Sequence, residues 1–312
     1  MPNPLIKGFS NAGRKFVGQL HKLLPAVVFG STSEANRARY QLEQAAEQAS
    51  REMKVASAIW LKGKPMAKAA AIGGKRVAAE IGVKFGGVSQ TLTKQLALDL
   101  ARNLAVASSS PNAFLTRTLR EATAIGVKAE DSWRKLVDPN SAMTRSLLKS
   151  AVGQQVYAKA VSSMMEDLGL DKGDRVLFMS GYRMEAEAYA KLVVRTRTME
   201  ALNEGKADQL EQAGVEYIET TQHEDVDEKD ICFFLQGKVW ALGENDLGIP
   251  VLPEEYGLPP WHPNCRHTFG AWQPKFEDQK TVDKAVESHT DDEEKLADWD
   301  GKVYQPASKS DD

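Results

Sequence analysis

The stretch Pro259-Pro260-Trp261-His262-Pro263-Asn264-Cys265-Arg266-His267 decides how the C-terminal half of this chain folds. It holds three of the 13 prolines, two of the five histidines and one of the two cysteines in 312 residues. Proline fixes φ and lacks an N–H donor. A segment this rich in proline is therefore neither a helix nor a central strand. The sequence therefore predicts a stiff, shaped loop, and such loops commonly carry function.

The loop carries metal-ligand residues at close spacing. His262, Cys265 and His267 follow the pattern His-x-x-Cys-x-His, and Cys232 lies upstream in a short apolar segment. Two sulfurs and two imidazoles are a set that a closed tetrahedral zinc site accepts, so these four residues are the candidate zinc ligands. Three other interpretations stay open: buried thiols beside hydrogen-bonded histidines, a nucleophilic Cys–His pair, or a disulfide between the two cysteines.

The same loop carries a family resemblance. Residues 260–267 resemble the closing signature of the phage head-morphogenesis family, the Mu F-like minor head proteins, whose typical form is Pro-Pro-x-His-Pro-Asn-Cys-Arg-Cys. Upstream blocks agree in order and spacing over about residues 150–275, among them an Arg-Thr-Arg-Thr helix segment, an acidic turn and a Gly-Lys-Val strand start. Besides the candidate ligands, the matching residues are Arg195, Thr196, Gly237, Pro260, Pro263, Asn264 and Arg266.

The chain departs from the typical family pattern at three positions. Leu235 stands where a second cysteine is common, His267 replaces the last cysteine, and Arg197 stands where an acidic residue is frequent. His267 keeps a metal ligand, whereas Leu235 removes one. The resemblance implies a structural protein without catalytic activity. It would be a minor component of the phage head, hence of the virion, assembled in the host cytoplasm with the portal protein and other capsid components.

The two halves of the chain carry opposite net charge. Residues 1–150 hold 23 Lys and Arg against 10 Asp and Glu, whereas residues 151–312 hold 17 against 33, which makes the halves +13 and −16. The basic half could face packaged DNA or an acidic protein surface. Aromatic residues are only 7% of the chain, so the sequence offers no stacking platform for single strands.

Periodicity predicts an α+β protein in three parts. Residues 1–140 form a helical basic domain, and residues 141–276 form a Mu F-like module of helices on a small antiparallel sheet. Residues 277–312 form an acidic tail, flexible or loosely helical. Within the module, residues 215–220 alternate as a strand, whereas residues 232–242 are either a hairpin or a helical turn that leads into a strand.

Breaker residues predict where several helices end. Gly73-Gly74 should interrupt the alanine-rich segment 66–87, and Ser108-Ser109-Ser110-Pro111 should end the helix that begins at residue 89. Another helix should end at Gly205. For segment 66–87 we favour a close-packed helix with small residues at its contacts over a cationic segment that lies on a membrane surface.

Two functions of other classes stay open. The first is an internal protein that is ejected with the DNA and meets the host membrane through residues 63–107. The second is a toxin or enzyme carried in the head. The sequence contains no run of eighteen apolar residues and no nucleotide-binding glycine pattern, metal-hydrolase helix motif or nucleophile elbow, so the structural role is preferred.

Overall fold

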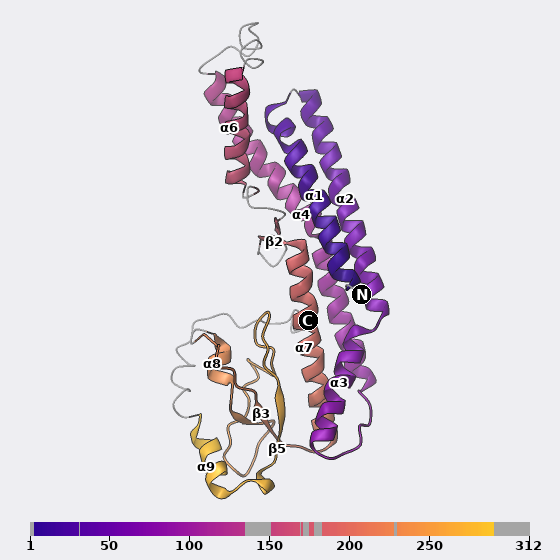
Figure 1. The fold of residues 1–312 in the computed structure, drawn as a ribbon, viewed down its shortest axis with the longest axis vertical. Helices are drawn as coiled ribbons and strands as arrows, with labels where there is room; N and C mark the ends of the chain where they lie inside the picture. Colours follow the sequence, from indigo (N-terminus) through magenta and orange to yellow (C-terminus); the bar gives the residue numbers. More distant parts are fainter. Residues whose placement is uncertain are drawn as a thin grey trace. The chain divides into compact units, whose positions relative to one another are not determined.

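The protein folds as two compact units, each built from segments that are distant in sequence. The computed structural model describes residues 3–30, 32–134, 151–168, 170, 175–177, 183–227 and 230–289. Unit 1 comprises Met1–Trp60 and Leu104–Lys191, and unit 2 comprises Leu61–Asn103 and Leu192–Asp312. Helices and a small antiparallel sheet confirm the predicted α+β class (Figure 1). The predicted domain boundary at residue 140 lies outside the described residues.

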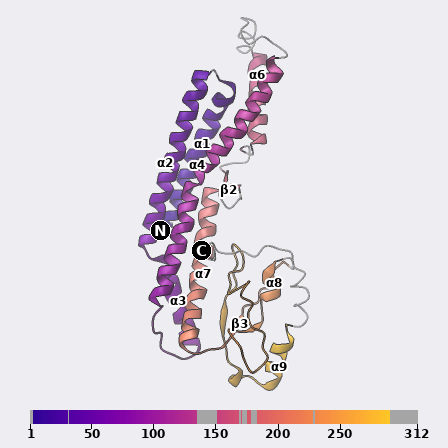
Figure 2. The same cartoon turned by 180° about the vertical axis from the view of Figure 1, so that it is seen from behind.

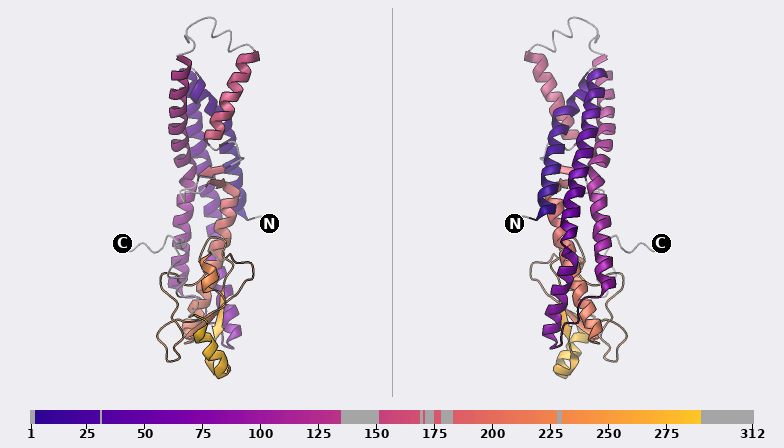
Figure 3. Two further views of the ribbon diagram at one scale, coloured as in Figure 1. Left: turned by 90° about the vertical axis from the view of Figure 1, so that its left-hand side faces the viewer. Right: turned by 90° about the vertical axis from the view of Figure 1, so that its right-hand side faces the viewer.

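Unit 1 is a bundle of long helices with a two-stranded ribbon. Its elements are α1 (Pro4–Phe29), most of α2 (Thr32–Lys62), the later part of α4 (Gln90–Arg134), α6 (Ala151–Asp167), β1 (Arg175–Leu177), β2 (Arg183–Glu185) and the start of α7 (Ala186–Gln212). Within this unit α1, α2 and α4 lie side by side, as the two further views of Figure 3 also show. The apolar face of α1 is buried, with Leu5, Phe9, Phe16 and Leu20 at helical spacing.

Helix α4 runs through the segment that was predicted to break it. Pro111 lies inside the helix, because the buried Leu104, Ala107 and Phe114 hold both of its sides in the core of unit 1. The hydroxyl of Ser108 donates to the Leu104 carbonyl at 2.7 Å and supplements the helix hydrogen bonds near the proline. Tertiary burial therefore outweighs the local breaker signal here.

Unit 2 places helices around a three-stranded sheet. Its elements are α3 (Pro65–Glu80), the start of α4, most of α7, β3 (Tyr217–Thr220), α8 (Ile231–Leu235), β4 (Val239–Ala241), β5 (Phe269–Trp272), η1 (Pro274–Phe276) and α9 (Gln279–Glu287). The strand order is β4-β3-β5, and both pairings are antiparallel. The predicted strand at 215–220 is β3, and the helical-turn alternative is correct because α8 leads into β4. Figure 2 shows α8 and α9 beside this sheet from behind.

Helices α3 and α7 pack backbone against backbone through glycines. A Cβ atom on Gly73 would collide with the carbonyl oxygen of Leu202, and one on Gly205 would collide with that of Ala70. The predicted helix breaks at both glycines are therefore wrong: α3 continues through Gly73-Gly74, and α7 continues through Gly205 to Gln212. Close approach of the two helices compensates for the low helix propensity of glycine. The preference for a close-packed helix with small residues at its contacts agrees with this structure.

The free edge of β5 is capped by side chains from these two helices. The Ala271 N–H donates to Glu80 Oε1 at 2.9 Å, and the Phe269 carbonyl accepts from Lys206 Nζ at 2.5 Å. Edge strands that leave such groups unpaired are templates for pairing with other chains. Glu80 and Lys206 thus occupy positions that another strand would otherwise take.

The opposite edge of the sheet, at β4, is covered by neighbouring chain segments. Ala241 exchanges backbone hydrogen bonds with the segment 250–252, at 3.0 Å in both directions. The buried His289 donates from Nε2 to the Val239 carbonyl at 2.8 Å, since a carbonyl can only accept. His289 follows α9, which packs Val282 and Ala285 on this side of the sheet. The beginning of the acidic tail is thus an ordered helix, and residues 290–312 lie outside the described part.

Candidate metal centre

The proline-rich loop is held against α7 by polar side chains of that helix. Asn264 adopts a left-handed backbone with φ of 66°, which asparagine tolerates better than most residues. Its N–H donates to Thr196 Oγ1 at 3.2 Å, and its side-chain oxygen accepts from Arg195 Nη1 at 3.0 Å. Three residues of the family signature, Arg195, Thr196 and Asn264, thus meet in space.

Asn203 is the buried polar anchor of the loop. Its Nδ2 donates to the carbonyls of Pro259 and His267 at 2.8 and 3.2 Å, and its Oδ1 accepts from Thr268 Oγ1 at 2.6 Å. The residue has no exposed surface. One side chain therefore ties together the two ends of the segment that carries Cys265.

An Asn203→Asp variant should lose at least about 3 kcal/mol of unfolding free energy, because a carboxylate cannot donate to the two buried carbonyls. Urea unfolding followed by circular dichroism measures the loss. The matched change at exposed Asn36, Asn36→Asp, should stay within about 0.5 kcal/mol of the parent. Equal effects at both positions would show that Asn203 does not anchor the loop.

Lys206 reinforces the same attachment one turn further along α7. Its ammonium donates to Thr268 Oγ1 at 2.8 Å as well as to the Phe269 carbonyl, and it lies 5.6 Å from the centre of the Phe269 ring. Burial lowers the pKa of Lys206 because desolvation disfavours the charged form, while the carboxylate of Glu80 opposes this shift.

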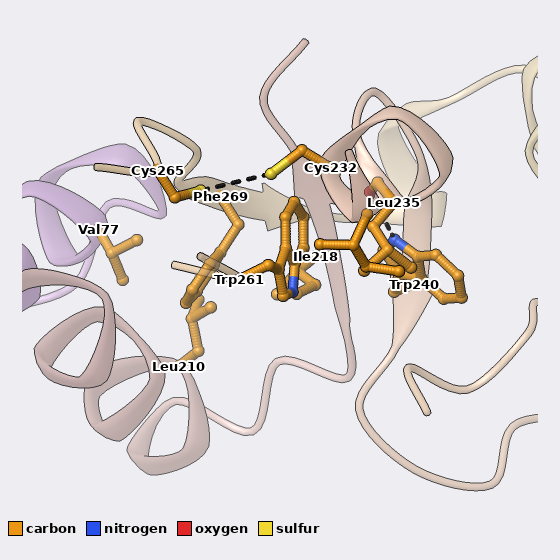
Figure 4. Packing of buried hydrophobic residues seen from close by; sticks show 10 residues of the cluster. Val77, Leu210, Ile218, Cys232, Leu235, Trp240, Trp261, Cys265 and Phe269 are labelled. Atoms are coloured by element: carbon orange, nitrogen blue, oxygen red, sulfur yellow. Dashed lines mark hydrogen bonds between the residues drawn. The ribbon is translucent and has the colours of Figure 1, made fainter. Parts of the chain in front are cut away.

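The two cysteines meet at the top of the main core cluster of unit 2. Cys232 from α8 and Cys265 from the loop place their Sγ atoms 3.6 Å apart, and both residues are at most 1% exposed (Figure 4). The cluster beneath them includes Trp240, Trp261 and Phe269. Hydrogen bonding from the Cys232 thiol lowers the pKa of Cys265 and raises that of Cys232. Of the two thiols, Cys265 is therefore the one that loses its proton more readily.

His262 and His267 each have one ring nitrogen within hydrogen-bonding distance of an oxygen acceptor. The Nδ1 atom of His262 lies 2.9 Å from the Pro263 carbonyl and must donate to it, which leaves Nε2 to carry the lone pair of the neutral ring. For His267, Nε2 lies 3.0 Å from Gln236 Oε1 and Nδ1 lies 3.4 Å from Cys265 Sγ. The oxygen of Gln236 is fixed because it also accepts the His223 N–H at 2.9 Å. Metal-ligating histidines usually have such an acceptor on their second nitrogen.

These distances fit a tetrahedral metal site. Sulfurs bound at 2.3 Å to one zinc ion would lie about 3.8 Å apart, and a sulfur and a nitrogen would lie about 3.6 Å apart. The ligand atoms of Cys232, His262 and Cys265 all lie within 4.8 Å of one another. His267 is outside this group of three and reaches it through its contact with Cys265. The structure therefore brings three of the four predicted ligands together and places the fourth beside one of them.

Arg266 and Leu235 are neighbours in sequence of the cluster residues. Arg266 donates from Nη2 to both carboxylate oxygens of Asp225, which lowers the pKa of that carboxyl and joins two exposed loops. Leu235, at the position of the missing family cysteine, is fully buried in the core cluster. A cavity of about 290 Å³ in unit 2 is lined by Ile81, Tyr217, Trp272 and their neighbours and includes none of the cluster residues.

Sequence reasoning did not assign roles to Asn203, Lys206 or Gln236. The first two could have been found, because Thr196, Asn203 and Lys206 recur at intervals of seven and three residues and so share one face of a helix. Gln236 carries no such signal, since its role depends on two segments that meet only in the folded chain. Gly237, also part of the family signature, has φ of 65°, a value that glycine adopts readily.

The proline-rich loop is thus fastened to α7, and the sulfurs of Cys232 and Cys265 are buried in the core cluster. Comparison with known families identifies the class of protein. The family described as phage minor capsid protein 2 matches residues 116–305, more than half of the chain, and the protein belongs to this family. The predicted membership in a phage minor capsid family is thereby confirmed.

No curated protein and no solved structure matches the chain. Across the described part of the chain, the helices fall short of the length and apolar character that crossing a membrane requires.

Proposed function

We propose that this protein is a minor structural component of the phage head that binds the portal and other capsid components, with unit 2 cross-linked by a zinc ion. The family match over residues 116–305 is the observation that carries the structural role. The same match supports a location in the virion, and assembly beside the portal is the part that we add. The likeness to Mu F-like proteins supports this addition through the loop 259–267 and its partners on α7.

Zinc would be held by Cys232, Cys265 and His262, with His267 as the fourth ligand. When bound, the ion would join α8 to the proline-rich loop and so restrict two segments that regular secondary structure does not connect. The chain itself supplies the rest of the arrangement: Gln236 and the Pro263 carbonyl orient the two imidazoles, and Asn203 holds the ends of the loop.

We also propose that the Cys–His cluster has no catalytic role. Cys265 and His267 lie close enough for a nucleophilic pair, yet they are 1% and 3% exposed. A nucleophile must reach its substrate, and these sulfurs lie in the core beside Trp261. The burial therefore supports a structural site.

Burial also counts against action on a membrane through residues 63–107. An interfacial helix inserts its apolar face among lipids. In α3 that face, from Met66 to Ala78, is already buried, and two of its small residues touch the backbone of α7.

Co-expression with the portal protein tests the proposal. Tagged protein should retain the portal through purification, and mass spectrometry of purified phage heads should detect it at low copy number beside the major capsid protein. Tagged major capsid protein without portal serves as the control for general adhesion. Absence from purified heads, or release of the portal at moderate salt, would contradict the proposal.

A further inference from the structure

The helical part of unit 2 exposes an excess of cations. Residues 61–103 contain eight Lys and Arg against two Asp and Glu, and all eight cations are exposed. This segment lies outside the part of the chain that the family match covers. Its charge is therefore not explained by the properties of the family module.

The cations of α3 share one face of the helix. Lys68, Ile72 and the pair Lys75-Arg76 recur at intervals of about four residues along the solvent side of α3, and Lys64 stands at its N-cap, so the cations form a stripe. The opposite side contacts α7 through Gly73. At 1.5 Å per residue the stripe is about 18 Å long.

The stripe lacks an acidic counterpart on its own helix. Glu80 is the one acidic residue between positions 62 and 84. Its carboxylate accepts a hydrogen bond from the Ala271 N–H of β5. On α1 the situation differs, because Lys15 pairs with Glu52 at 3.1 Å. The positive charge of the α3 face is therefore not neutralised by acidic residues of α3 itself.

We propose that this face of α3 binds the phosphate backbone of duplex DNA. A linear array of mostly lysine point charges suits phosphates, whereas lysine is depleted in protein–protein interfaces. One aromatic ring lies beside the stripe, that of the half-buried Phe85 at 5.8 Å from Lys75 Nζ, whereas a single strand needs a series of rings on which successive bases can stack. A length of about 18 Å corresponds to about five phosphates along one strand. That the DNA is the packaged genome rests on the proposed place of the protein in the head.

Salt-dependent binding of the full-length protein to a labelled duplex of random sequence tests this proposal. Each phosphate contact contributes about 0.9 to the slope of log K against log salt concentration. The fourfold variant Lys64→Gln, Lys68→Gln, Lys75→Gln, Arg76→Gln should therefore show a slope that is shallower by about 3 to 4. The control variant Lys7→Gln, Lys22→Gln, Arg37→Gln, Lys54→Gln removes the same charge from exposed sites in unit 1 and should keep most of the slope.

Two results would overturn the proposal. One is an unchanged slope in the α3 variant, verified as folded by circular dichroism. The other is an equal loss in the control variant, which would show a response to net charge only. A synthetic peptide of residues 290–312 should compete only weakly with DNA for binding to the protein. If the peptide binds α3 and DNA does not, the proposal is also wrong, and the acidic tail is the occupant of this face. These measurements use no portal or head, so a negative result leaves the proposed head function standing.

Discussion

Replacing Gly205 by alanine is expected to lower the free energy of unfolding by at least about 3 kcal/mol and to release α3 from the rest of unit 2. The added methyl group would meet the Ala70 carbonyl, a backbone atom that cannot swing aside as a side chain can. Relief requires α3 to move away from α7, and that movement would also pull the buried Val77 out of the core cluster and Glu80 from the edge of β5. Calorimetry and hydrogen exchange of the α3 amides measure the two effects.

Gly18 provides the matched control, because it lies inside α1 with open space where a Cβ would be placed. A Gly18→Ala variant should gain about 0.5–1 kcal/mol, since alanine has the higher helix propensity. The same substitution thus has opposite signs at two helical glycines. A Gly205→Ala protein as stable as the parent would show that α3 and α7 do not pack backbone against backbone.

Zinc removal is expected to have the second large effect. Protein from zinc-supplemented cultures should contain one zinc per chain, and a chelator or Cys265→Ser should remove it and lower Tm by roughly 10 °C or more. Serine preserves the shape of cysteine but is a far poorer zinc ligand, so the change acts mainly on metal binding. Acidification should release the ion as well, because protons compete for the sulfurs and imidazoles. Elemental analysis and thermal scans provide the measurements.

His289 separates metal loss from simple destabilisation. It is a buried histidine that hydrogen-bonds Val239 and contacts the Trp240 ring, outside the group of metal ligands. The His289→Gln variant should have a lower Tm but still bind zinc, whereas the Cys232→Ser variant should have a lower Tm and bind no zinc. If purified protein binds no zinc and its Tm does not change with chelators, the zinc proposal is wrong and Cys232 and Cys265 form a metal-free, hydrogen-bonded pair.

Local patterns were sufficient where the structure depends on neighbouring residues. The proline-rich loop and strand β3 each follow from composition and alternation within about ten residues, whereas the segment before β4 stayed open between a hairpin and a turn of helix. The convergence of Cys232, His262 and Cys265 also agrees with their choice as ligands, although they come from two separate segments. The proline-rich loop is rigid and α8 is a single short turn of helix, so few arrangements of these side chains are possible.

The errors arise where one residue type has two uses. Glycine at positions 73 and 205 can end a helix or let two helices touch, and only the partner helix decides between these uses. The pairing of α3 with α7 joins residues more than 120 positions apart, for which the sequence has no periodic signal. The division into two discontiguous units follows from the same long-range contacts.

The interleaved order of the units has a consequence for synthesis. Helix α3 leaves the ribosome well before α7, because Ala70 and Gly205 are 135 positions apart in the chain. At a translation rate of roughly 5–20 residues per second, about 7 to 27 seconds pass between the synthesis of Ala70 in α3 and that of Gly205 in α7. During that interval Val77 and its neighbours are exposed to chaperones and to other nascent chains. The yield of folded protein should therefore depend on translation speed and chaperone supply more than its final stability would suggest.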